Sequence, residues 1–300
     1  MKRWMMFLVL AGVFLGCRDN SPCPDGTKRV GDPPPADREQ WCVKNGDTKE
    51  GPYMSWYSNG DKKEEGAFKD GKKDGKWVRY HKNGKKVRET NYEKGDKVGE
   101  FIKWDKNGQM VERGSYSHGA RVGEWKEWHR NGKLKSQGKW ENGKKEGPWT
   151  YWFDNGKKKT EAFMKSGKKQ GKHTEWHSNG QKRMEGQRNM GKFEGTWTAW
   201  HENGKTKDIG QWKNGKGEGE WKWFDKSGKL TRTGTYRLGK RHGVWTDYDK
   251  NGNPEKITHY ENGNVVKEEA VTAPANDTDS AATAPETTPD APAPKKPETK

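Results

Sequence analysis

Residues 123–146 read GEWKEWHRNGKLKSQGKWENGKKE, and this stretch decides the fold because the chain repeats its pattern without insertion or deletion. Repeat positions are counted from Gly123 as position 1. The opening glycine recurs every 24 residues, at Gly51, Gly75, Gly99, Gly123, Gly147, Gly171, Gly195, Gly219 and Gly243. A fixed period of this length is typical of repeat proteins, in which each unit packs on its neighbours.

Two further glycines in every repeat predict the turns. Position 10 follows Asn in eight of nine repeats, as in Asn131-Gly132, and the exception is Ser227-Gly228. Asn-Gly favours a two-residue type I′ hairpin turn, since both residues tolerate positive φ. Gly143 at position 21 predicts a four-residue loop from Asn142 to Lys145 that leads into the next hairpin.

This turn predicts the register and the two faces of each hairpin. Trp125 is expected opposite Gly138, and Gly123 opposite Trp140, all on one face with each ring lying over a glycine. The aromatic residue at position 6 is expected on the other face, opposite a cation at position 13 that forms a cation–π contact. The expected pairs are Trp128 with Lys135, Trp152 with Lys159, Trp176 with Arg183 and Trp200 with Lys207.

The amino-acid composition, taken together with the spacing of the aromatic residues, distinguishes an ordered chain from a disordered one. Only 27% of residues are hydrophobic, 34% are charged and the net charge is +17, a combination that usually indicates disorder. The 17 Trp and 39 Gly at fixed spacing instead predict an ordered all-β fold, an elongated single-sheet antiparallel meander of nine hairpins over residues 51–269. A transmembrane barrel is excluded, because its strands need about 9 to 11 residues with an apolar outer face.

The segment Gly-Glu-Trp-Lys-Glu-Trp-His-Arg-Asn-Gly at 123–132 resembles the bacterial variant of MORN repeats, a class often grouped with YwqK-type antitoxins. The resemblance covers residues 51–266 and implies a scaffold or binding surface, with no catalytic residues to carry over. His173 and Arg188 replace aromatic residues in the sixth repeat, and Met164 replaces one in the fifth. Stacking is expected to be weakest there.

The N-terminus is typical of an exported protein. Lys2 and Arg3 precede an apolar run that ends at Gly16-Cys17, so residues 1–16 are predicted to be a lipoprotein-type signal peptide with Cys17 as the lipidated N-terminus. An ordinary secretory signal is the alternative. Both place the chain outside the cytoplasm, and the first anchors it in the bacterial envelope, on either membrane, facing the periplasm or exterior.

Residues 17–50 form a predicted Pro-rich segment that caps the array. Cys23 and Cys42 are an even pair in an oxidising compartment, which predicts a disulfide. Residues 270–300, rich in Ala, Thr and Pro, are predicted to be a disordered tail.

The histidines were candidates for metal binding, because four of them share position 7: His81, His129, His177 and His201. Equivalent residues in successive repeats lie about 9.6 Å apart, too far to share a metal, so they are interpreted as solvated strand residues. No nucleophile, phosphate-loop or metalloprotease motif is present. We therefore expect no enzymatic activity, no metal and no cofactor.

Charge provides the remaining functional signal. Residues 51–269 contain 49 Lys and Arg against 31 Asp and Glu. Many cations flank the turns, predicting basic ribs on both long edges; the alternative is that they serve only solubility. The candidate binding surface combines these cations with the position-6 rings: Trp128, Trp152, Trp176, Trp200, Lys144, Lys145, Lys168 and Lys169.

The leading hypothesis is a non-enzymatic, envelope-anchored scaffold that binds a protein or an anionic envelope polymer, such as lipid headgroups or cell-wall glycan. A YwqK-type antitoxin, or a lipid-anchored immunity protein, is one alternative. A glycan-binding module is another, because exposed Trp can stack on sugar rings. Export argues against nucleic acid as the partner.

Overall fold

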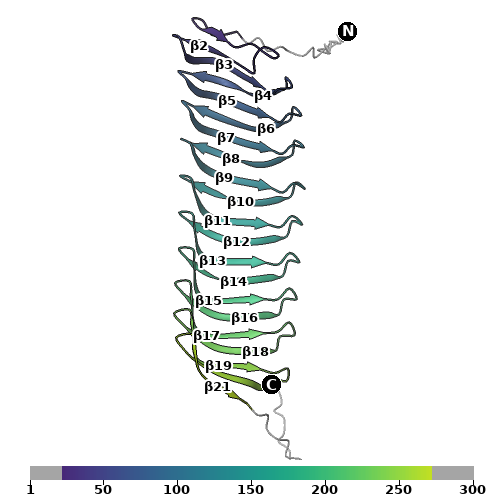
Figure 1. The fold of residues 1–300 in the computed structure, drawn as a ribbon, viewed down its shortest axis with the longest axis vertical. Helices are drawn as coiled ribbons and strands as arrows, with labels where there is room; N and C mark the ends of the chain where they lie inside the picture. Colours follow the sequence, from purple (N-terminus) through teal and green to yellow (C-terminus); the bar gives the residue numbers. More distant parts are fainter. Residues whose placement is uncertain (1–21, 272–300) are drawn as a thin grey trace, which may run out of the picture.

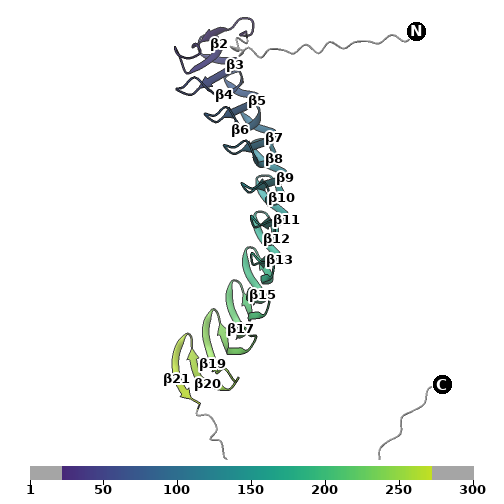
Figure 2. The same ribbon diagram turned by 90° about the vertical axis from the view of Figure 1, so that its right-hand side faces the viewer.

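The protein is one long antiparallel sheet in a computed structural model that describes residues 22–271. All 21 strands in this part of the chain follow one another in sequence order, each paired with the next (Figure 1). Figure 2 shows that the sheet is one layer thick and bends into an arc along its long axis. The sequence correctly predicted this all-β meander.

The nine predicted hairpins run from β3 to β20, with two strands before them and one after. The strands are β1 (Lys28–Val30), β2 (Glu39–Lys44), β3 (Thr48–Trp56), β4 (Lys62–Lys69), β5 (Lys72–Tyr80), β6 (Lys86–Glu93), β7 (Asp96–Trp104), β8 (Met110–Ser117), β9 (Ala120–Trp128), β10 (Leu134–Glu141), β11 (Lys144–Trp152), β12 (Lys158–Lys165), β13 (Lys168–Trp176), β14 (Lys182–Asn189), β15 (Lys192–Trp200), β16 (Thr206–Lys213), β17 (Lys216–Phe224), β18 (Leu230–Arg237), β19 (Lys240–Tyr248), β20 (Pro254–Glu261) and β21 (Asn264–Ala270).

The Asn-Gly turns differ from the prediction. At the end of β9 the Gly132 amide donates to the His129 carbonyl at 3.0 Å, and Gly132 has a φ of +80°, whereas Asn131 does not adopt positive φ. This is a longer turn closed by a left-handed glycine, one of the common hairpin connections. Asn131 serves through its side chain instead, since its amide donates to the Asp154 carbonyl of the next turn at 2.7 Å.

The two-residue turn lies at the opposite edge of the sheet. Asn142 and Gly143 both have positive φ, at 48° and 73°, and Glu141 pairs directly with Lys144. The predicted four-residue loop is therefore wrong. Gly147 has a φ of +68° beside a register shift, and on the turn side of this shift Trp140 lies opposite Lys145.

The register of the hairpin centre matches the prediction, although the turn does not. Trp125 pairs with Gly138, and Gly123 with Trp140. A bulge between Leu134 and Ser136 compensates for the longer turn. As a result, position 6 faces position 12 and not position 13: Trp128 pairs with Leu134, Trp152 with Lys158, Trp176 with Lys182 and Trp200 with Thr206. The predicted cation–π partners at position 13 were wrong.

One face, here called the packed face, holds the buried residue at position 3 of every repeat. Its members are Tyr53, Trp77, Phe101, Trp125, Trp149, His173, Trp197, Trp221 and Trp245. Since neighbouring residues along a strand alternate in direction, Trp128 lies on the other side, here called the open face. The two-faced ribbon predicted from the sequence is therefore present.

Each Trp at position 3 lies over a glycine of the preceding hairpin, and not of its own hairpin as expected. A Cβ added to Gly138 would lie 2.3 Å from the ring of Trp149, and one on Gly114 would lie 2.2 Å from Trp125. The ring leans backwards because its N–H donates to the preceding strand, as Trp149 Nε1 does to the Lys139 carbonyl at 3.1 Å. This contact joins successive repeats.

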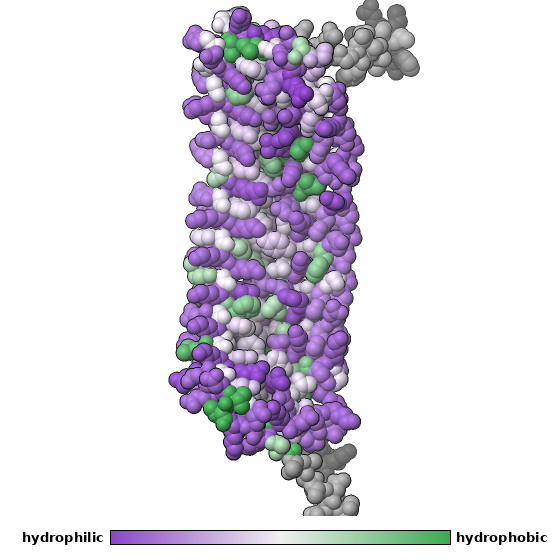
Figure 3. Space-filling model, in the orientation of Figure 1, coloured by the Kyte–Doolittle hydropathy of each residue, from purple (hydrophilic) through white to green (hydrophobic). Residues whose placement is uncertain are grey.

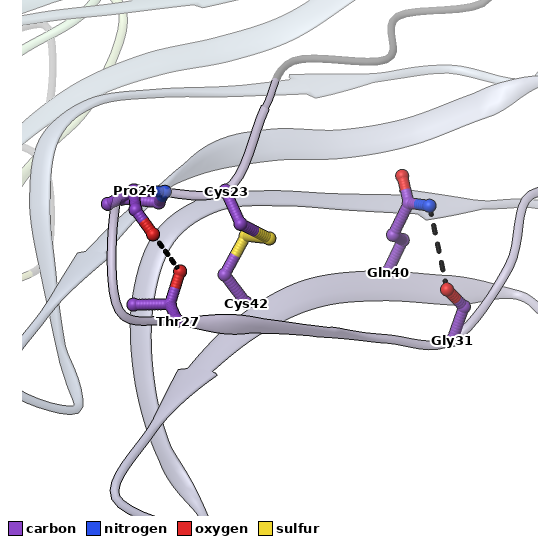
Figure 4. The surroundings of a disulfide bond; sticks show 6 residues. All are labelled: Cys23, Pro24, Thr27, Gly31, Gln40 and Cys42. Atoms are coloured by element: carbon purple, nitrogen blue, oxygen red, sulfur yellow. Dashed lines mark hydrogen bonds between the residues drawn. A yellow bond between two sulfur atoms is a disulfide. The ribbon is translucent and has the colours of Figure 1, made fainter.

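The N-terminal end of the array is closed by the segment that precedes the first hairpin. Cys23 and Cys42 are joined by a disulfide that ties the chain before β1 to β2, as Figure 4 shows. Gln40 beside it is buried and donates to the Gly31 carbonyl at 3.5 Å. The predicted signal peptide, Cys17 and the residues after 271 lie outside the described part of the chain.

Candidate binding surfaces

The four predicted surface rings lie in one column on the open face. Trp128, Trp152, Trp176 and Trp200 are all half-buried at position 6 of successive repeats. Cations of the preceding hairpin approach two of them, with Lys158 Nζ 5.9 Å from the Trp176 ring centre and Lys182 Nζ 5.6 Å from that of Trp200. The column therefore offers ring surface that is partly covered by lysine.

The spaces between these rings are shallow and charged. A hollow of about 460 Å³ beside Trp128 is also lined by Glu124, Lys126, Glu100 and Arg113. Arg113 and Glu100 form an ion pair at 2.6 Å, so their charges are already matched. Figure 3 shows a surface dominated by hydrophilic side chains, with only small, separate hydrophobic patches.

The predicted lysine pairs at the two-residue turns divide into two kinds. Lys144 is exposed at the edge, whereas Lys145 folds over the packed face, with Nζ 4.0 Å from the Trp149 ring centre and 2.7 Å from the Tyr151 hydroxyl. Lys168 and Lys169 divide in the same way, and burial lowers the pKa of Lys169. Each of these two turns therefore presents one exposed lysine and not two.

The exposed lysines of this edge, here called the lysine row, share position 22. They are Lys72, Lys144, Lys168, Lys192, Lys216 and Lys240. Five of them occupy consecutive repeats, from Lys144 to Lys240, so neighbouring members lie two strands apart. That corresponds to a spacing of about 9.6 Å along the edge.

The opposite edge also carries exposed cations at position 8, which are Lys82, Lys106, Arg130, Lys226 and Lys250, and other lysines of this edge link neighbouring turns. Lys133 Nζ donates to the Asn155 carbonyl of the next turn at 2.9 Å, and Lys157 does the same to Asn179 at 2.6 Å. The position-7 histidines have a similar role, since His129 Nε2 lies 3.0 Å from the Trp152 carbonyl. The interpretation of these histidines as solvated residues was wrong for His129, His177 and His201, which are half-buried and bridge successive repeats.

The sixth repeat departs most from the pattern. His173 replaces the packed-face Trp, is fully buried and bonds through Nε2 to Glu175 at 2.9 Å. Burial lowers the pKa of His173, while the hydrogen bond from His173 and the ion pair with Arg183 lower the pKa of Glu175 to about 2. Polar contacts replace stacking at this point of the packed face.

The same repeat exchanges its aromatic and cationic positions. Arg188 occupies position 18, where other repeats place mostly aromatic rings, and Phe193 occupies position 23, where most place a cation. The guanidinium lies 3.5 Å from the Phe193 ring centre, so a cation–π contact survives with its partners reversed. The sequence pattern identified Arg188 but not Phe193. Phe193 could have been identified because it stands at position 23, where most other repeats have a cation.

Residues 22–271 hold no group of three or more His, Cys, Asp or Glu placed to bind a metal ion. Within the same range, no helix is long and apolar enough to cross a membrane.

This geometry defines a class of protein. It is a single-layer β-repeat protein in which the aromatic rings of each hairpin pack over glycines of the preceding hairpin. The chain belongs to the MORN repeat variant family, whose model matches residues 73–94, 97–118, 121–142, 145–166, 193–214, 217–237 and 241–262. The family model does not match the sixth repeat, which contains His173 and Arg188.

The solved structures that the chain resembles are much larger. They include TcdB2-TccC3 without its hypervariable C-terminal region, at 11% identity and a TM-score of 0.18, with 74% of this chain and 13% of that chain covered. TcdB2-TccC3-Cdc42 follows at 11% identity and a TM-score of 0.14, with 78% and 17% covered. The chain therefore spans under a fifth of these relatives. No curated protein shows significant sequence similarity to it.

Proposed function

We propose that this chain is a non-enzymatic, envelope-anchored scaffold whose lysine row binds an anionic partner, either an envelope polymer or an acidic protein surface. The observation that carries the proposal is the regular spacing of free lysines along one edge of a rigid sheet. Lys144 and Lys168 are exposed, and their ammonium groups have no ion-pair partner in residues 22–271. A row of like charges at constant spacing attracts a polymer of opposite charge.

The single-layer architecture supports a binding role. Both faces of the sheet are open to solvent, so the fold serves chiefly to hold side chains at fixed intervals. Anchoring follows from the predicted lipidation of Cys17, which would leave the array outside the cytoplasm. Lipid headgroups and anionic cell-wall polymers are then the nearest polyanions.

The proposal is tested by reversing the lysine row in the full chain and measuring binding to poly-L-glutamate. A quadruple variant converts Lys144, Lys168, Lys192 and Lys216 to Glu. We expect at least a tenfold loss of affinity, together with a weaker dependence on salt, because each lysine near an anionic surface contributes roughly 1 kcal/mol.

A matched control separates the row from bulk charge. It reverses four other exposed lysines outside the row, Lys103, Lys106, Lys139 and Lys222, and so changes the net charge equally. We expect the control to retain most of the affinity. Equal losses in both variants, or no loss in the first, would contradict the proposal.

A glycan-binding role is the second candidate, and the half-exposed ring column of Trp128, Trp152 and Trp176 favours it. Stacking on sugar rings would make retention on isolated cell wall insensitive to salt, whereas binding by the lysine row requires retention to fall as salt rises.

A further inference from the structure

Three repeats have a carboxylate at position 14 of the packed face, and two of them follow one rule: a cation nine residues later, at position 23, neutralises the carboxylate. Glu64 pairs with Lys73 at 3.6 Å, and Glu112 pairs with Arg121 at 2.7 Å. The same cation also lies over the packed-face ring, as Arg121 does 4.0 Å from the centre of Trp125. Position 23 therefore serves both the carboxylate and the ring.

Asp208 is the carboxylate that breaks this rule. It occupies position 14 of the seventh repeat, but the residue nine positions later is Gly217. Within residues 22–271, Asp208 forms no ion pair, although it is half-buried and burial raises the pKa of its carboxyl group. A half-buried carboxylate without a direct ion-pair partner loses solvation that more distant charges, here Lys207 and His201, repay only in part.

Asp208 also borders a large hollow on the described sheet. The hollow has a volume of about 730 Å³, and its lining includes Met184, Ala199 and Asp208. These three residues lie side by side on neighbouring strands, because Met184 pairs with Ala199 and Ala199 pairs with Asp208. Ala199 is the smallest residue at position 5, where the adjacent repeats have Glu175 and Trp223, so space opens above it.

The other charged groups around the hollow form no ion pair with Asp208, although Lys207 and His201 lie near enough to offset part of the rise that burial causes in its pKa. Arg183 is held by Glu175 in an ion pair at 2.8 Å. Lys207 and Lys226 lie in the lining with Glu202, and neither lysine pairs with Asp208. Three cations, Arg183, Lys207 and Lys226, therefore lie near three carboxylates when Glu175 is included. One of these carboxylates, Asp208, lines the hollow without an ion-pair partner in residues 22–271.

We propose that this hollow is a binding site for an ammonium or guanidinium group, with Asp208 as its counter-ion because the array supplies no position-23 cation in this repeat. A basic side chain of a polypeptide and a small polyamine both carry this chemistry. The site is separate from the lysine row, which binds the opposite charge.

The test measures binding of two probes to the full chain by calorimetry: methylguanidinium, and the peptide acetyl-Gly-Arg-Gly-amide with its neutral citrulline analogue. We expect the arginine peptide to bind and the citrulline peptide to bind at least tenfold more weakly. Binding of methylguanidinium as well assigns recognition to the group alone. Binding of the peptide alone assigns it to a polypeptide.

Three variants locate the site. Asp208→Asn should weaken binding at least tenfold, whereas Glu112→Gln, at a carboxylate that Arg121 already neutralises, should leave it unchanged. Gly217→Arg should abolish binding and raise the melting temperature by supplying the missing internal cation. A Cβ at Gly217 would lie 3.3 Å from the Tyr236 ring, which requires only a small shift.

If Gly217→Arg fails to fold, Ala199→Leu fills the hollow instead and should also abolish binding. Equal binding of the arginine and citrulline peptides would overturn the proposal, because charge would then not be recognised. Unchanged binding by Asp208→Asn, or no binding of either probe, would overturn it as well. Reversal of the lysine row should not affect this site, so the two proposals fail separately.

Discussion

At the scale of single residues, the array depends on the fit between the aromatic ring at position 3 and the position-16 residue of the preceding repeat, over which the ring packs. Position 16 is Gly wherever the next repeat places Trp on the packed face, as in Gly138 below Trp149. The two exceptions within the array pair Thr90 with Phe101 and Ala162 with His173, where the ring is smaller. The glycine is therefore required by the close approach of an indole, and not by backbone conformation.

This match predicts the effect of adding one methyl group. Gly138→Ala would place a Cβ 2.3 Å from the Trp149 ring and force the indole from its seat. We expect a loss of about 1 to 3 kcal/mol in the free energy of unfolding, measured by urea denaturation. Lys139→Ala, next to it and exposed, is the control and should change stability by less than about 0.5 kcal/mol. Equal losses of stability in the two variants would mean that the packing of Trp149 over Gly138 does not stabilise the array.

At the scale of elements, the sequence predicted the hairpins and their faces but not the turns that join them. Asn-Gly is compatible both with a two-residue turn and with a longer turn closed by a left-handed glycine, so the dipeptide alone could not decide. The register at Trp125 and Gly138 was correct because the bulge near Leu134 cancels the added turn residue. A bulge depends on contacts with both neighbouring strands, which one hairpin sequence does not reveal.

The candidate surface was predictable to the same extent. Alternation placed Trp128 on the open face, and adjacency to the turn placed Lys144 at the edge. Nothing in the local pattern showed that Lys145 turns inward, since that depends on the irregular path of β11 at Gly147, which brings Lys145 over the Trp149 ring of the same strand. The site at Asp208 could not be predicted because its missing partner becomes evident only when the ion pairs of other repeats are known.

The sixth repeat predicts a pH dependence of stability. The pKa of Glu175 is lowered to about 2, so its contribution is complete above its ordinary value of 4.5 and is lost as pH falls toward 2. The lowered pKa of His173 acts in the same direction below its ordinary value of 6.5. Stability should therefore fall steadily as pH decreases from 6.5.

Urea denaturation across this pH range measures the effect. Glu175→Gln should reduce the slope between pH 4.5 and 2, with a difference of roughly 1 to 3 kcal/mol across the window. Glu100→Gln removes an exposed carboxylate paired with Arg113 and should leave the slope nearly unchanged. A wild-type curve that rises as pH falls would show that these pKa shifts have been assigned the wrong direction.

At the scale of the whole molecule, the chain is a ladder of hairpins in which each repeat contacts only the one before and the one after. Stability in such an array is the sum of nearest-neighbour contacts, here the seated rings and the stitched turns. The disulfide between Cys23 and Cys42 closes one end, and β21 forms the other. Distances along the lysine row therefore depend only on the number of intervening repeats.

The most direct test of this account is a set of distances along that edge, measured by double electron–electron resonance between non-cysteine spin labels. One label stays at Asp96, and the second moves to Lys144, Lys192 or Lys240, all at position 22. A single-layer meander predicts distances that increase almost linearly, by about 19 Å for every two repeats, to roughly 19, 38 and 58 Å. Distances that level off or shorten with the third pair would show that the repeats close into a compact body, and would contradict the account.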